Sequence, residues 1–473
     1  MIYNNLKYII LFFVPSLLLA ADSGHGSVPH LNGEGLAIYW VIPFIGILLS
    51  IAIFPLVALE FWHHNFGKVS LFWAILLILP FSVTQGLEIT IYELLHVGLL
   101  EYIPFIILLL SLFTISGGVR LKGTLVGTPV LNTAMIFIGT ALASWMGTTG
   151  SAMLLIRPLI KANQFRKNKV HIIVFFIFLV ANIGGSLTPL GDPPLFLGFL
   201  KGVDFFWTTS AMFLPMLFMV ACLLVIFFFL DTYFYRKEDI TIEDKSENEK
   251  LGLEGSFNLL LLAGVIFGVL LSGFWKPGIN FQIYHVHIEL QNIVRDILLL
   301  ILTYLSWNLT SKRIREANEY TWFPIVEVGK LFAGIFVTII PAIAILKAGS
   351  HGALASVVSS VSKNGEPINF MYFWLTGILS SFLDNAPTYL VFFNTAGGVP
   401  SILMNDIPNT LLAISAGAVF MGANTYIGNA PNFMVKSISE SSGIEMPSFF
   451  GYFFKWAVPI LMPLFIIVTY IFF

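Results

Sequence analysis

Residues 185–196 read GSLTPLGDPPLF, and residues 422–433 read GANTYIGNAPNF. The two stretches keep Gly, Thr, Gly, Pro and Phe in register at an offset of 237 residues, about half of the 473-residue chain. The same offset aligns four further pairs of identical or similar residues: Asn132 with Asn369, Leu142 with Leu379, Ser144 with Ser381, and Ser151 with Thr388. One offset without a gap indicates an internal duplication.

The composition is that of a membrane protein. Hydrophobic residues make up 57% of the chain and charged residues 11%, with a mean hydropathy of +0.88, whereas soluble domains are about 25% charged. Many apolar runs approach the roughly 20 residues of a membrane-spanning helix and are too long for barrel strands. The lipid bilayer is therefore a partner. The net charge of −2, without a long basic block, argues against nucleic acid, and the lone Cys222 excludes disulfides and iron–sulfur clusters.

The first 21 residues are typical of a secretory signal peptide. Lys7 precedes an apolar stretch that ends at Ala20 and Ala21. An uncleaved additional helix is the alternative.

Charge placement predicts the topology of the first repeat, residues 36–235. From an external start, Tyr39–Leu59 crosses to a cytoplasmic turn, and Ser70–Val83 and Leu99–Ser116 follow as the next spans. Asn132–Ile160 is broken near Gly147 and has basic residues on both sides, so it is expected to be a re-entrant hairpin whose tip faces a cavity. The predicted turn after the first span contains His63, His64 and Lys68.

An interrupted span over Val170–Leu200 and a helix from Phe205 complete this half. Residues 236–255 are expected to form a solvated cytoplasmic linker, and residues 256–473 to form the second repeat. The loop after the second hairpin, residues 394–406, has no Arg or Lys, unlike its counterpart, as an inverted repeat requires.

The predicted fold is an all-α polytopic membrane protein with two inverted repeats, each with a re-entrant hairpin and a discontinuous transmembrane helix. In the second repeat the spans are expected near Ser256–Gly273, Asp296–Trp307 and Phe323–Leu346, the hairpin at Phe370–Phe393, the interrupted span at Pro408–Val435, and a last helix after it.

Interrupted helices at matching positions of two halves are the best sequence indication of a transporter's binding site. Their free amide and carbonyl ends attract ions, and hydroxyl, amide and carboxylate oxygens suit sodium. The alternative is that Gly and Pro only kink the helices for packing. The polar residues at the two breaks are Asn182, Ser186, Thr188 and Asp192, and Asn424, Thr425 and Asn429.

Asp192 and Asp384 are the two carboxylates that the span count places deep in the protein. An ionised carboxylate costs several kcal/mol at membrane depth, so each is expected to bind a cation or a proton. Competition between the two ligands at one carboxylate would be a complete exchange mechanism. A helix cap or a neighbouring lysine is the alternative. Lys347 and Glu327 are interpreted as interfacial groups.

The segments ANIGGSLTPLGDPP (residues 181–194), DNAPT (384–388) and GANTYIGNAPN (422–432) resemble the ion transporter superfamily of citrate-transporter-like proteins, NhaD-type sodium/proton antiporters, arsenite-efflux pumps and divalent anion/sodium symporters. The resemblance implies two inverted repeats, alternating access, frequent homodimers, and residence in a bacterial-type inner membrane. Carried onto this sequence, it implies that Thr148, Thr149, Asn385 and Thr388 are ligands at the hairpin tips and that the polar residues of the breaks line the interrupted helices. We expect Asp192, Asp384 and Asn385 to bind sodium, with Ser151 as a further site residue.

Two readings of the function follow. The favoured one is sodium/proton antiport without a cofactor, because two intramembrane aspartates are present and neither hairpin tip carries Arg or Lys. The alternative is sodium-coupled transport of citrate or another di- or tricarboxylate, and another inorganic anion is less favoured. A channel would differ by lacking saturable turnover. An enzyme is not expected, because the spans lack His-Glu-x-x-His and Gly-x-Ser-x-Gly patterns.

Overall fold

The computed structural model describes residues 28–238, 250–363 and 365–473. Within these ranges, eight helices are long and apolar enough to cross a membrane, or nine if the bent pair α14 (Phe323–Thr338) and α15 (Ile340–Lys347) is one span. The strands of the described part form only two-stranded ribbons. The prediction of an all-α polytopic membrane protein is therefore confirmed. The expected signal peptide, residues 1–21, lies outside the described residues.

The first spans differ from the prediction in where the chain turns. The predicted turn at His63, His64 and Lys68 is wrong, because these residues lie inside a helix. The break falls instead at Ala58, with φ −149° and ψ 58°, shortly after Pro55 has weakened the end of the preceding helix. The elements here are η2 (Gly33–Gly35), η3 (Ile38–Val41), α2 (Ile42–Val57), α3 (Leu59–Thr84), and the run α4 (Leu87–Val97), η4 (Gly98–Tyr102) and α5 (Ile103–Ser116).

The expected first hairpin consists of two helices that pack against each other, α6 and α7. Gly147 lies between them with φ +80°, a conformation that favours glycine. The expected interrupted helix consists of α8, η5 and α9, and α10 closes this half. Their bounds are α6 (Pro129–Met146), α7 (Thr148–Ala162), α8 (Val170–Leu179), η5 (Ile183–Ser186), α9 (Pro193–Leu200) and α10 (Phe205–Lys237).

The end of the linker is held by a short ribbon. Strand β1 (Arg120–Lys122) pairs antiparallel with β2 (Gly252–Glu254). Arg120 and Lys122 both lie within 3.3 Å of the Glu254 carboxylate. Residues 239–249 of the expected linker lie outside the described part.

The second half repeats the order of elements. Its two hairpin arms are α17 and α18, and its interrupted helix is α20, η7 and α21. The bounds are α11 (Phe257–Phe274), β3 (Asn280–Ile283), β4 (Val286–Glu289), α12 (Leu290–Leu309), α13 (Lys312–Ala317), α14, α15, η6 (Gly349–His351), α16 (Ala355–Ser360), β5 (Ser362–Lys363), β6 (Glu366–Pro367), α17 (Asn369–Phe382), α18 (Asn385–Thr395), α19 (Pro400–Asn405), α20 (Pro408–Met421), η7 (Gly422–Asn424), α21 (Ala430–Ser441), α22 (Phe449–Tyr452), η8 (Phe453–Ala457) and α23 (Val458–Phe472).

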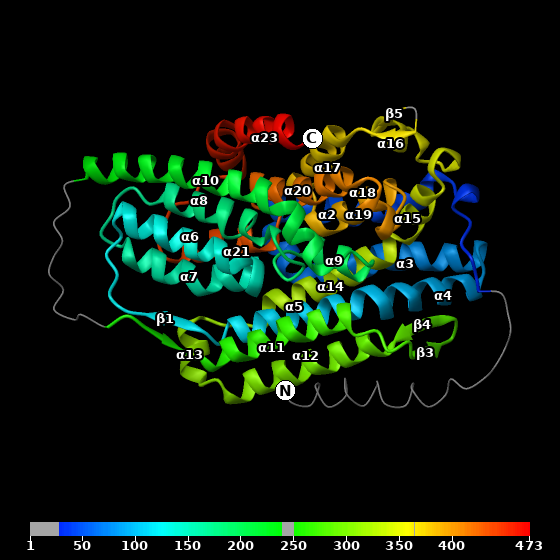
Figure 1. Cartoon of the computed structure of the whole chain (residues 1–473), viewed down its shortest axis with the longest axis horizontal. Helices are drawn as coiled ribbons and strands as arrows, with labels where there is room; N and C mark the ends of the chain where they lie inside the picture. The colour runs from blue at the N-terminus through cyan, green and yellow to red at the C-terminus, as the bar shows by residue number, and fades with distance from the viewer. Residues whose placement is uncertain (1–27, 239–249, 364) are drawn as a thin grey trace.

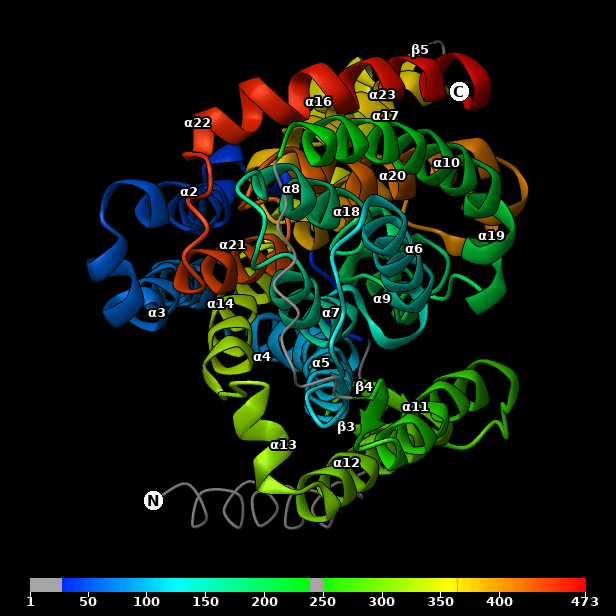
Figure 2. The same cartoon turned by 90° about the vertical axis from the view of Figure 1, so that its left-hand side faces the viewer.

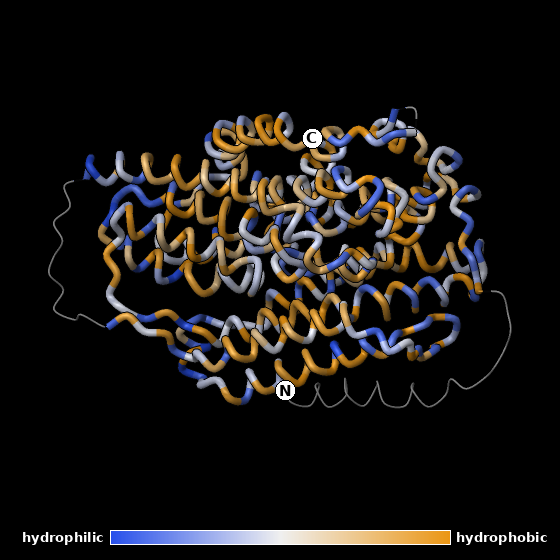
Figure 3. The backbone as a smooth tube through the Cα atoms, in the orientation of Figure 1, coloured by the Kyte–Doolittle hydropathy of each residue, from blue (hydrophilic) through white to orange (hydrophobic). Residues whose placement is uncertain are grey.

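The two halves form three layers (Figures 1 and 2). Helices α11 and α12 pack on α5 at one edge, and α10 and α23 lie together at the opposite edge. The hairpins and interrupted helices lie between these layers. Hydrophobic residues run along the long helices, whereas many hydrophilic residues gather in the loops at their ends (Figure 3).

The interrupted helices of the two halves meet in the middle of the molecule. Helix α9 of the first half packs on α18 of the second, and α21 of the second half packs on α7 of the first. Likewise, α20 contacts η5 and α8 contacts η7. Each half therefore packs its interrupted helix on the hairpin of the other.

Candidate functional site

Asp192 begins the second part of the first interrupted helix. It is the N-cap of α9, with extended backbone, and Pro193 and Pro194 follow at the first helical positions, where proline is favoured. An aspartate at this position usually accepts a hydrogen bond from its own helix. The Asp192 side chain accepts no such bond, so its carboxylate is free to face the centre of the protein.

Three side chains from three other elements converge on that carboxylate. Asn429 Nδ2 donates to Oδ1 over 2.8 Å, and Thr148 Oγ1 donates to the same oxygen over 3.2 Å. Asn385 Nδ2 donates to Oδ2 over 2.6 Å. Thr148 begins α7, Asn385 begins α18 and Asn429 precedes α21. The centre thus joins both hairpin tips and both interrupted helices at one carboxylate.

The residues of this centre are buried, and none of the four carries a positive charge. Asp192, Asn385, Asn429 and Thr148 are each at most 2% exposed. Among the described residues, no lysine, arginine or histidine forms an ion pair with Asp192. Neutral donors alone offset little of the cost of a buried charge. The carboxylate is therefore suited to bind a cation or a proton.

The two breaks have the same internal hydrogen bonds. Thr188 Oγ1 donates to the Ser144 carbonyl, and Thr425 Oγ1 donates to the Ser381 carbonyl. Each threonine hydroxyl also accepts a backbone N–H two residues later, over 3.2 Å in both cases. These threonines hold each unwound segment against the first arm of its own hairpin.

Close approach of the backbone explains the repeated glycines. A Cβ on Gly191 would lie 2.0 Å from the Gly185 carbonyl oxygen, and one on Gly428 would lie 2.5 Å from the Gly422 carbonyl oxygen. In each break the chain therefore crosses itself at two glycines, and no larger residue fits without a backbone shift.

Three amide oxygens near the breaks have no hydrogen-bond partner among the described residues. They belong to Asn182, Asn385 and Asn424, all at most 1% exposed. Their amide nitrogens are used: Asn182 Nδ2 donates to Asn432 Oδ1 over 2.7 Å, and Asn424 Nδ2 donates to Ser381 Oγ over 2.9 Å. A buried carbonyl oxygen without a donor is costly. Such oxygens are the ligands that hard cations prefer, so this donor set fits sodium.

The other expected site residues lie near the centre but bond locally. The hydroxyls of Ser151, Ser186 and Thr388 donate to the backbone carbonyls of Gly139, Ile183 and Asp384. Thr149 lines the smaller of the two cavities described below. Asp384 is half-buried and caps α18 by accepting the Ala386 N–H over 3.1 Å. Asp384 thus caps a helix, as the alternative interpretation of this carboxylate predicted. It also lines both cavities.

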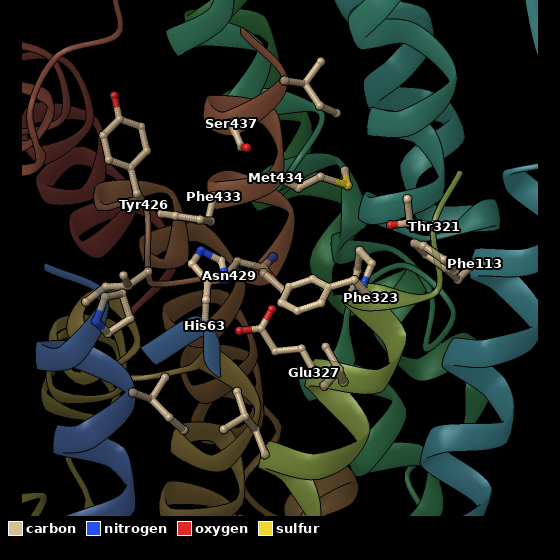
Figure 4. Close-up of a pocket in the computed structure, with 18 of the residues that line it drawn as sticks. His63, Phe113, Thr321, Phe323, Glu327, Tyr426, Asn429, Phe433, Met434 and Ser437 are labelled. Atoms are coloured by element: carbon tan, nitrogen blue, oxygen red, sulfur yellow. The ribbon is translucent and has the colours of Figure 1, made fainter. Parts of the chain in front are cut away.

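Two cavities reach the centre. The smaller, about 100 Å³, is lined by Thr148, Asp192, Asp384 and Asn429. The larger, about 390 Å³, shares Asp384 and Asn429 with it and extends to Glu319, whose side chain is 70% exposed. Figure 4 shows the larger cavity with Glu327 and Asn429 facing its interior. A path lined by these cavities therefore runs from solvent toward Asp192.

The charged side chains that line the path are mostly acidic. Asp192 and Asp384 line the smaller cavity, which has no basic lining residue in the described part of the chain. Arg157, His63, Glu319, Glu327 and Asp384 line the larger one, and Arg157 is paired with Glu319 over 2.8 Å. Asp384 and Glu327 form no ion pair within the part of the chain that the structure describes, so the path attracts cations.

Sequence reasoning missed three residues of this site. Ser144 and Ser381 receive the threonine hydroxyls of the two breaks, and the 237-residue offset aligns them, which was the available signal. Asn432 donates to the carbonyls of Gly422 and Thr425 and accepts from Asn182. Nothing in the pattern distinguished it from its neighbours.

Comparison with known families gives one full-length match. A family model described as "Putative citrate transport" matches residues 33–473, which include both halves and both breaks. No curated protein matches the chain significantly. The chain belongs to this citrate-transport family of membrane transporters.

Proposed function

We propose that this protein is a secondary active transporter that exchanges sodium for protons at Asp192 by alternating access. The observation that carries the proposal is the acidic path to a buried carboxylate that has neutral hydrogen-bond donors and no ion-pair partner. Sodium and the proton are the transported ions, and no cofactor or chemical reaction is needed.

The proposed exchange follows from competition at one group. With sodium bound, the ionised Asp192 is balanced by the cation, and buried amide oxygens such as that of Asn385, whose Nδ2 already bonds to Asp192, would add oxygen ligands. With a proton bound, the carboxyl is neutral. Asp192 with either sodium or a proton bound can move through a low-dielectric interior, whereas the ionised carboxylate without a cation is costly there. Transport is therefore tightly coupled.

Inverted repeats support the alternating access. Asp192 and Asn429 occupy matching positions 237 residues apart and are hydrogen-bonded to each other over 2.8 Å. Contact between equivalent positions is what a pseudo-two-fold axis passing between them would give. The reciprocal packing of α9 on α18 and of α21 on α7 has the same symmetry. We propose that this axis lies in the membrane plane, so that each hairpin is re-entrant from an opposite side.

The orientation follows from the charge pattern. The last turn of α7 contains Lys161, and the loop beyond it contains Arg166, Lys167 and Lys169, which favours a cytoplasmic position by the positive-inside rule. Arg157 and Glu319, at the open end of the larger cavity, lie toward the same side. We therefore propose that this is an inward-facing state. The proposed location is a bacterial-type inner membrane, with a homodimer as the expected assembly.

Sodium-coupled carboxylate transport is the second candidate, because the family description names citrate. A cavity of about 390 Å³ has room for a small organic anion. The lining disfavours it, since the one arginine there is already paired with Glu319 and the remaining charged groups are acidic. A tri-anion would therefore meet repulsion.

Flux measurements on purified protein in proteoliposomes test the proposal. An imposed proton gradient should drive radiolabelled sodium in the opposite direction with no organic anion present, and added citrate should leave the rate unchanged. If sodium moves only when citrate is present, and labelled citrate moves with it, the second candidate replaces the antiporter.

A further inference from the structure

Glu327 is a membrane carboxylate with no assigned task. It lies near the start of α14, close to the span end where it was expected, and it also lines the larger cavity together with Asp384 and Asn429. Figure 4 shows its carboxylate directed into the cavity, on the side of His63 and Asn429. Glu327 does not line the smaller cavity, whereas Asp384 and Asn429 line both. It therefore precedes them on the path from the solvent-exposed Glu319.

Local packing fixes this direction. Phe323 and Glu327 are four residues apart on α14 and share one face. The His63 ring packs on Phe323 with ring centroids 5.7 Å apart. The neighbouring Trp62, 3% exposed, lines the same cavity beside His63.

No basic side chain in the described ranges forms an ion pair with Glu327. The charged or titratable groups that face the cavity around it are His63 of α3, Arg157 of α7, Glu319 before α14, and Asp384 at α18. Arg157 is held by Glu319. Glu101 of η4 is also an acidic residue of a membrane helix, but it is paired with Lys201. An acidic residue without such a partner is costly in a membrane helix and is usually functional.

We propose that Glu327 binds the incoming monovalent cation in the inward-facing cavity, before the cation reaches Asp192. This inference rests on the proposed function and adds a second, side-specific binding residue to it. The Glu327 carboxylate raises the local cation concentration at the mouth of the smaller cavity. It acts only from the cavity side, because it does not line the smaller cavity that contains Asp192.

Sodium titrations on each face of oriented vesicles test the inference. Glu327→Gln should raise the half-saturating sodium concentration on the cavity side by about tenfold, with the maximal rate within about twofold of wild type. Sodium titrated from the opposite side should give the wild-type value. Glu327→Asp should restore part of the loss. The control is Glu316→Gln, an exposed residue of α13 outside both cavities, which should behave as wild type.

An unchanged cavity-side titration in Glu327→Gln, or an equal change on both faces, would overturn the inference and leave the antiporter intact. Absence of sodium/proton exchange in the wild-type protein would overturn both.

Discussion

At the scale of single residues, Asp192 differs from an ordinary helix cap because its carboxylate is used by other elements. Its hydrogen-bond partners come from α7, α18 and the residue before α21, and none comes from α9. Removing its charge should therefore affect transport more than folding, since the cap contributes nothing to its own helix.

Asp192→Asn should reduce proton-driven sodium flux at least about 100-fold. The amide cannot take up a proton, and its NH₂ group would face the donating amides of Asn385 and Asn429. The measurement is radiolabelled sodium uptake in proteoliposomes, with folding monitored by gel filtration. Asp204→Asn is the matched control, because Asp204 is exposed and its side chain caps nothing. Substantial flux in Asp192→Asn would remove the carboxylate from the mechanism.

The sequence indicated which residues lie at the centre, but it indicated less about what each of them does there. The interrupted helices indicated Asp192 and Asn429 as site residues, and a hydrogen bond joins these two side chains in the structure. Whether they bind sodium stays a prediction. Glu327 could not be recognised, because its role depends on a cavity wall shared with His63 on another helix. Long-range packing of this kind leaves no local pattern.

At the scale of elements, the crossed glycines set the shape of the breaks. The sequence predicted these breaks closely, because Gly and Pro act on the backbone locally. The matched starts of α7 and α18, at Thr148 and Asn385, again differ by 237 residues. The first turn was mispredicted because charged residues such as Lys68 were taken to mark a loop, while Ala58 actually ends the helix.

Gly191→Ala should destabilise the protein by at least about 3 kcal/mol, because the new Cβ would lie 2.0 Å from a backbone oxygen that cannot move freely. Thermal unfolding in detergent, followed by tryptophan fluorescence, measures the effect. Gly98→Ala is a suitable comparison, since a Cβ there meets nothing within 4 Å and the backbone is helical. Equal unfolding temperatures for the two variants would contradict the crossing described for this break.

A buried ionic cluster fastens the first hairpin to α10. Arg166, in the loop after α7, donates to Asp231 over 2.5 Å and to Glu238 over 3.2 Å. His171 and Asn132 also bond to the Asp231 carboxylate, over 2.8 and 2.9 Å. Arg166 and Asp231 have fully buried side chains. The hairpin and α10 should therefore move as one body.

Arg166→Met should cost about 3–5 kcal/mol of stability, because it leaves Asp231 buried without its main counter-charge. Lys436→Met provides the contrast, since its partner Glu440 is 42% exposed and such surface pairs contribute under about 1 kcal/mol. Both are measured as shifts in thermal unfolding at constant detergent. A small shift for Arg166→Met would mean that water reaches Asp231.

At the scale of the whole molecule, the proposed inverted symmetry makes a prediction about sidedness. The loop after α7 and the loop after α18 occupy matching places in the two halves, so opposite orientation puts them in different compartments. Arg166 itself is buried and cannot report on this. Its neighbour Lys167 is exposed, as is Asn405 at the end of α19. Cys222 is the only native cysteine, so single reporters are easily made.

In a Cys222→Ser background, Lys167→Cys should react with a membrane-impermeant maleimide only from the cytoplasmic face, and Asn405→Cys only from the outer face. The reason is that contact between the matched residues Asp192 and Asn429, with the reciprocal packing of α9 on α18 and of α21 on α7, favours a two-fold axis at the centre. An axis along the membrane normal would put both loops on one side, whereas an axis in the membrane plane separates them. Labelling of intact cells and of inside-out vesicles distinguishes the two cases. Labelling of both cysteines from the same face would exclude the in-plane axis and, with it, alternating access by exchange of the two halves.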